Sequence, residues 1–97
     1  MKNALAFANM GETHQYGRQL LQQKKTKEAL EVFKANHAKY PGQFTTMMGL
    51  VRGYSANGDY KTALQYAEKA LPMAPDTNNK NNLNGMIDKL KAGKNVN

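Results

Sequence analysis

A repeat of 34 residues is the feature that most limits the folds open to this chain. A shift by that length aligns Arg18 with Arg52, Lys27 with Lys61, Ala29 and Leu30 with Ala63 and Leu64, and Pro41 with Pro75. Both copies also have the same order of signals: an apolar stripe with helical spacing, a polar break, an alanine–leucine stripe and a proline. The pattern predicts a recurring unit of two helices joined by a turn.

Apolar side chains recur at three- and four-residue spacing in five segments, which predicts five amphipathic helices. The expected helices are Met10–Gln23, Lys27–Tyr40, Gln43–Ala56, Tyr60–Leu71 and Asn78–Ala92. Pro41 and Pro72 end the second and the fourth, because proline lacks the N–H that continues a helix. The sequence therefore predicts an all-α fold.

A helix–turn–helix unit of this length resembles the tetratricopeptide repeat family. The second copy carries more of the family pattern, at Leu50, Tyr54, Gly58, Tyr60, Ala63, Ala70 and Pro75. The first copy carries the pattern at Gly17, Ala29, Phe33 and Pro41. The departures are Thr13 and Met47 in place of tryptophan, Val51 in place of glycine, Ala67 in place of an aromatic residue and Asn36 in place of alanine. The resemblance covers roughly residues 10–77 and implies an α-α superhelix of two stacked helix-turn-helix repeats with a capping helix.

The resemblance also implies a division of the chain into five parts. They are an N-terminal extension or the end of a preceding helix (1–9), repeat 1 (10–43), repeat 2 (44–77), a C-terminal capping helix (78–93) and a tail (94–97). Hairpins in such arrays stack because none can cover its own apolar face alone. Two repeats and a cap make a short array, so we also expect a further helical turn in the extension, a homodimer, or a fragment of a longer protein. The stretch resembles the repeat-bearing tail of larger bacterial proteins.

The charge of the chain favours anionic partners. The sequence has 14 lysine and arginine residues against 7 acidic ones, a formal net charge of +7. Acidic peptides, nucleic acid and a membrane surface all suit such a charge, although the basic residues are spread along the chain as on a solvated surface. No run approaches the ~18 apolar residues of a membrane span. The first residues are too few and too polar for a secretory signal, so the compartment stays open and includes that of a longer, exported protein.

The chain lacks the residue sets that catalysis or metal binding needs. It has no cysteine, and neither His14 nor His37 has a partner at metal-ligand spacing. Its glycines do not form a phosphate-binding loop, and its acidic residues do not pair on an apolar helix face. We therefore expect a protein that is not an enzyme, with no catalytic, cofactor-binding or metal-binding residues.

Arg18 and Arg52 are the most specific functional signal, because they are the only arginines and occupy equivalent places in the first helix of each hairpin. In proteins similar to this one, the first helices line a concave groove that holds an extended peptide or a helix. The resemblance places these residues on that groove: His14, Arg18, Thr45, Met48, Arg52, Ser55, Asn82 and Lys89. Adjacent helices lie ~8–10 Å apart, so the two guanidinium groups would bind successive carboxylates. The alternative is that both arginines face solvent or pair with a nearby acid.

The leading prediction is a non-catalytic protein–protein interaction module that binds a peptide or helical segment, preferably acidic, in this groove. One alternative is a basic helical-repeat protein that binds nucleic acid, and another is a structural self-association or spacer unit. Nucleic acid is less favoured, because aromatic and basic residues do not alternate on one predicted face. Salt-dependent binding to oligonucleotides and concentration-dependent mass separate these alternatives.

Overall fold

The computed structural model describes residues 9–97, and this part of the chain contains α-helices and no strand. The helices are α2 (Met10–Gln22), α3 (Thr26–Lys39), α4 (Phe44–Ala56), α5 (Tyr60–Ala70) and α6 (Thr77–Lys91), with a short 3₁₀ turn, η1, at Leu71–Met73. Every predicted helix is found, with both ends within one residue of the expected position. The all-α prediction is confirmed. The N-terminal extension, apart from Asn9, lies outside the described residues.

Side-chain caps and prolines account for the helix boundaries. The Asn9 side chain accepts a hydrogen bond from the Glu12 N–H at 2.8 Å, and the Glu12 carboxylate accepts one from the Asn9 N–H at 3.1 Å. At α5 and α6 the Asp59 and Asp76 side chains accept a hydrogen bond from the N–H three residues further on, without the reciprocal bond. Each such cap contributes about 0.5–2 kcal/mol to helix stability. Local sequence is therefore sufficient to start these helices.

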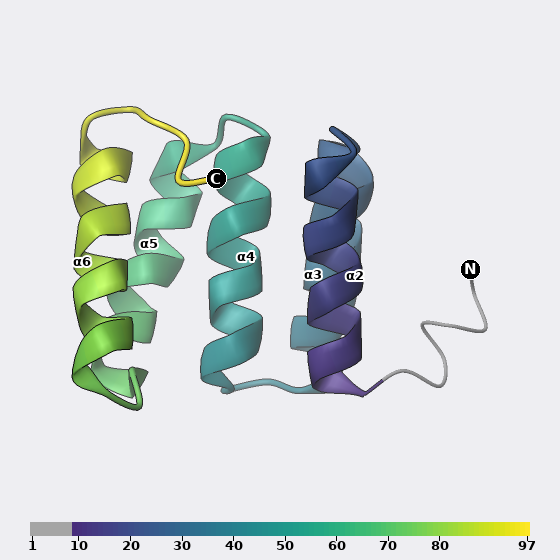
Figure 1. Ribbon diagram of the computed structural model, residues 1–97, viewed down its shortest axis with the longest axis horizontal. Helices are drawn as coiled ribbons and strands as arrows, with labels where there is room; N and C mark the ends of the chain where they lie inside the picture. The colour runs from purple at the N-terminus through teal and green to yellow at the C-terminus, as the bar shows by residue number, and fades with distance from the viewer. Residues whose placement is uncertain (1–8) are drawn as a thin grey trace.

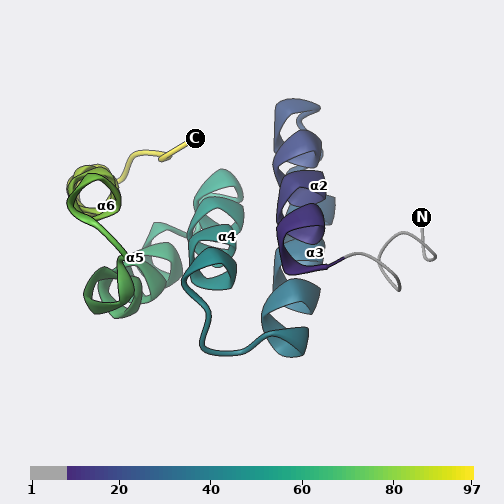
Figure 2. The same cartoon turned by 60° about the horizontal axis from the view of Figure 1, so that its bottom comes forward.

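The helices form two layers (Figures 1 and 2). Helices α2, α4 and α6 make one layer, and α3 and α5 make the other. Successive helices pack against one another, and α2 also packs against α4. The C-terminal segment lies between α4 and α6 in both views. It leaves the end of α6 and turns back toward α4.

Phe33 is the centre of the first hairpin's packing and is 1% exposed. A Cβ atom on Gly17 of α2 would lie 2.5 Å from Phe33 Cε1, and one on Gly49 of α4 would lie 2.6 Å from Phe33 Cδ1. Both distances are far below van der Waals contact, so only glycine leaves room for the ring at these two positions. The small residues of the repeat pattern thus let α2 and α4 approach the ring of α3.

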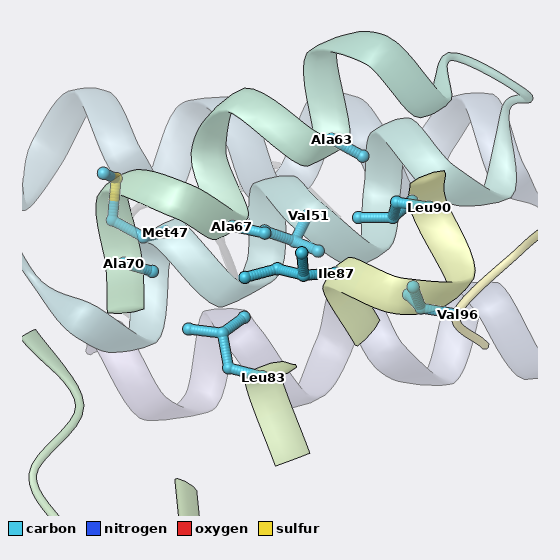
Figure 3. Packing of buried hydrophobic residues seen from close by; sticks show 9 residues of the cluster. All are labelled: Met47, Val51, Ala63, Ala67, Ala70, Leu83, Ile87, Leu90 and Val96. Carbon is cyan, nitrogen blue, oxygen red and sulfur yellow. The ribbon is translucent and has the colours of Figure 1, made fainter. Parts of the chain in front are cut away.

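The second hairpin buries its apolar face against α6 (Figure 3). The cluster comprises Met47, Val51, Ala63, Ala67, Ala70, Leu83, Ile87, Leu90 and Val96. The outer face of α6 is polar, since Asn78, Lys80, Asn84 and Asp88 are exposed. A helix that is apolar inside and polar outside ends a repeat array in the way a cap requires. The five-part division of the chain stays a prediction, and α6 begins one residue before the predicted cap.

Candidate functional site

Two pockets open on the layer of α2, α4 and α6, and we call this surface the groove face. The first, of about 340 Å³, lies between α2 and α4 and is lined by Arg18, Lys24 and Arg52 among others. The second, of about 420 Å³, lies between α4 and α6 and is lined by Arg52 and Lys89 together with several asparagines. Arg52 lines both pockets, whereas neither lining includes an acidic residue.

The structure brings the two arginines together. Arg18 and Arg52 line one pocket, and the Arg52 side chain is half-buried. Burial lowers the pKa of Arg52, and the neighbouring charge of Arg18 lowers it further. In the described part of the chain neither arginine forms an ion pair; the recorded pair, Lys34 with Glu31 at 3.6 Å, lies on α3. The two arginines therefore line the same pocket, with no acidic side chain in its lining, and their role in binding stays a prediction.

His14 lies next to this pair and is kept neutral by its surroundings. Burial, and then the charges of Arg18 and Arg52, lower the pKa of His14 to about 4. Its ring centroid is 5.6 Å from that of Phe33, and within residues 9–97 its buried Nδ1 has no hydrogen-bond partner. His14 thus contacts Phe33 in the core of the first hairpin and lies close enough to both arginines for their charges to act on it. It carries no charge at neutral pH.

The other predicted site residues fall in different places. Met48, Asn82 and Lys89 line the pocket between α4 and α6. Thr45 is half-buried and lines neither pocket. Ser55 is 1% exposed, because the C-terminal segment covers it. Five of the eight residues expected on the groove therefore line one or both pockets, and Arg18 and Arg52 are among these five.

The C-terminal segment is the part of the site that sequence reasoning missed. Asn95 and Asn97 line the first pocket and Val96 lines the second. The segment reaches the groove face because Gly93 has φ +71, and the N–H groups of Gly93 and Lys94 close back onto the carbonyls of Leu90 and Lys89. This closing turn reverses the chain direction after a helix. The one available signal was a single valine in an otherwise polar tail.

Acid should destabilise the protein through His14. The pKa of a histidine is near 6.5 in the unfolded chain but about 4 here, so protonation favours the unfolded state. The contribution is fully present above pH 6.5 and is lost as the pH falls toward 4. Between pH 7 and pH 4 the wild type should lose about 2 kcal/mol more unfolding free energy than His14→Gln. Urea unfolding across this range measures the difference, and parallel pH profiles for the two proteins would contradict it.

The described residues contain no group of three or more metal-ligating side chains. Nor does any helix among them have the length and hydropathy needed to cross a membrane. The linings of the two pockets consist mainly of basic side chains, amides and a few apolar side chains.

Comparison with known proteins supplies the family. The tetratricopeptide repeat model matches residues 20–83, about two thirds of the chain. No curated protein and no solved structure matches it. Repeats of this family generally mediate protein–protein interaction and typically serve as non-enzymatic scaffolds. With its two helical hairpins, its closing helix and this match, the chain belongs to the tetratricopeptide repeat family.

Proposed function

We propose that this protein is a non-catalytic interaction module whose groove face binds an acidic segment of a partner protein. The observation that carries the proposal is the set of basic side chains around the two pockets, Arg18, Lys24, Arg52 and Lys89, with no acidic side chain in either lining. Positive charge without a counter-charge is what an anionic ligand complements.

Arg52 makes the strongest case. Holding a half-buried guanidinium near a second one is unfavourable, and a carboxylate placed between the two removes both the repulsion and the unpaired charge. Arginine also offers a planar set of donors that matches a carboxylate in a bidentate manner. An acidic side chain in the first pocket is therefore bound more strongly by Arg52 than it would be by a fully solvated lysine.

Acidic side chains occur in both helix layers. Helix α3 carries Glu28 and Glu31, α5 carries Glu68, and α2 and α6 carry Glu12 and Asp88. None of these acidic residues lines either pocket. The positive charge is therefore uncompensated at the pockets themselves, which is where an acidic partner would gain most.

Protein is favoured over nucleic acid as the partner. Binding of single strands relies on aromatic side chains on which bases stack. Neither pocket lining includes an aromatic residue. Tyr54 and Tyr66 stack on each other instead, with ring centroids 5.8 Å apart.

The double change Arg18→Ala, Arg52→Ala should weaken binding of an acidic partner and leave folding intact. Two charge-assisted contacts in a partly excluded pocket predict a loss of about five- to hundredfold in affinity. Fluorescence anisotropy with labelled ten-residue peptides, one rich in aspartate and one neutral, measures the change. The melting temperature should stay close to that of the wild type.

Lys27→Ala, Lys61→Ala is the matched control. These lysines also occupy equivalent positions in the two repeats. Their replacement removes the same amount of charge, but from the exposed surface of the outer layer. An equal loss of affinity in both double variants would show that the peptide responds to net charge alone, against the proposal. Sedimentation over a range of concentrations tests self-association of the same samples.

A further inference from the structure

The C-terminal segment 95–97 occupies the middle of the groove face, between the two pockets. Ser55 of α4 meets it twice: Ser55 Oγ accepts a hydrogen bond from the Val96 N–H and donates one to Asn95 Oδ1, both at 2.9 Å. Asn97 Nδ2 donates to the Arg52 carbonyl oxygen at 2.9 Å. Main-chain and side-chain groups of α4 thus hold a short segment of the chain itself.

Val96 anchors the segment. It is 8% exposed and belongs to the apolar cluster that includes Ile87 and Leu90 of α6, as Figure 3 shows. The neighbouring residues Lys94, Asn95 and Asn97 are exposed. One buried aliphatic side chain and the hydrogen bonds to α4 together offset the ordering of a four-residue segment, so the docked and free arrangements differ little in free energy.

Asn95 stands where an acidic side chain would bind better. Asn97 Oδ1 lies 3.5 Å from Arg52 Nη1, a long contact for a neutral amide oxygen. A carboxylate at position 97 would strengthen this contact, but it would lose the hydrogen bonds that Asn97 Nδ2 donates to the Arg52 carbonyl oxygen and to Asn95 Oδ1. Asn95 uses its side-chain oxygen to accept hydrogen bonds from Ser55 Oγ and from the N–H and Nδ2 of Asn97. Aspartate at that place would keep all of these.

We infer that residues 95–97 are an intramolecular occupant of the groove, and that the partner carries an aspartate followed by a short aliphatic residue that takes the place of Asn95 and Val96. The inference rests on the proposed function and adds a sequence pattern and a competitor to it. The neutral Asn95 holds the site weakly, and the charged partner displaces the segment because its carboxylate enters the pocket lined by Arg18 and Arg52. Only the fraction of molecules with a free groove binds, which reduces the apparent affinity by that fraction.

The probe is a capped, fluorescein-labelled peptide, Asp-Asp-Val-Asp-Asp, compared with Asn-Asn-Val-Asn-Asn and Asp-Asp-Gly-Asp-Asp. The acidic valine peptide should bind more tightly than either relative. Val96→Ser, which loosens the tail, should tighten its binding by about three- to tenfold. Asn95→Asp, which keeps the hydrogen bonds that Asn95 Oδ1 accepts and adds a negative charge in the pocket of Arg18 and Arg52, should weaken its binding by a similar factor.

Asn84→Asp is the charge control, because it adds the same negative charge on the exposed outer face of α6. A loss of affinity as large as that of Asn95→Asp would overturn the inference. If Val96→Ser proves unstable, Asn95→Asp decides alone, because it keeps Val96. Backbone NMR provides a second readout, since the Val96 and Asn97 amide signals should shift on binding.

The outcomes separate this inference from the proposed function. Binding that depends on Arg18 and Arg52 but is equal in every tail variant overturns the competitor and leaves the function standing. Equal affinity for the valine and glycine peptides overturns the aliphatic part of the pattern. No binding of any acidic peptide to any variant overturns both.

Discussion

Deletion of residues 77–97 is expected to unfold the protein. The deletion removes Leu83, Ile87 and Leu90, which are 0%, 7% and 4% exposed, and it leaves the apolar face of α5 open to water. Losing one such side chain costs about 2–5 kcal/mol, and a domain has about 5–15 kcal/mol of net stability. Circular dichroism should show little helix and no cooperative melting, and size-exclusion chromatography should show aggregation.

Point substitutions test whether the buried apolar side chains of α6, and not merely the presence of a further helix, stabilise the fold. Leu83→Ala should lower the unfolding free energy by about 2–5 kcal/mol. Asn84→Ala, at the next and exposed position, should change it by less than about 0.5 kcal/mol. Deletion of residues 94–97 alone isolates the contribution of the tail. A truncated protein without α6 that melts as a monomer at the wild-type temperature would show that the cap is dispensable.

The second large effect is expected at Phe33. Phe33→Ala removes the ring that fills the space between α2, α3 and α4, and it should cost about 3–5 kcal/mol of unfolding free energy. Chemical denaturation measures the loss. A cost below about 1 kcal/mol would mean that the helices close over the cavity.

Glycine substitutions test the same packing from the other side. Gly17→Ala places a Cβ atom 2.5 Å from the ring, which has Gly49 of α4 close beside it, and should destabilise the fold by about 1–3 kcal/mol. Gly85→Ala is the matched control: it lies inside α6 with no atom within 4 Å of the new Cβ. Alanine there should stabilise the helix by about 0.5–1 kcal/mol. Equal effects at both glycines would contradict the packing described here.

The helices of this chain could be predicted closely because their signals are local. Proline at positions 41 and 72, the turn before Tyr60 and the apolar stripes mark where each helix begins and ends. The 34-residue period also predicted the neighbourhood of Arg18 and Arg52, since equivalent residues of stacked repeats face the same side. The structure places both in the lining of one pocket.

The groove residues were harder to predict. The repeat pattern placed Ser55 on an open surface, but Ser55 is buried under Val96 and Asn95. Thr45 was expected beside the arginines and lines neither pocket. A residue's position on a helix face shows its direction, whereas its exposure depends on what packs over it.

The sequence by itself determined the helical class, the helix boundaries, the repeat and the pairing of the two arginines, because periodicity, caps and breakers act over a few residues. The tertiary structure alone decided that no acidic side chain lines either pocket, that His14 is neutral and that the tail docks on α4. Each of these depends on side chains far apart in the chain: Val96 is held by Ser55 and by the apolar cluster between α4, α5 and α6. One valine among polar residues makes no periodic pattern, so its burial follows only from the turn at Gly93 and the space that the packed helices leave for it.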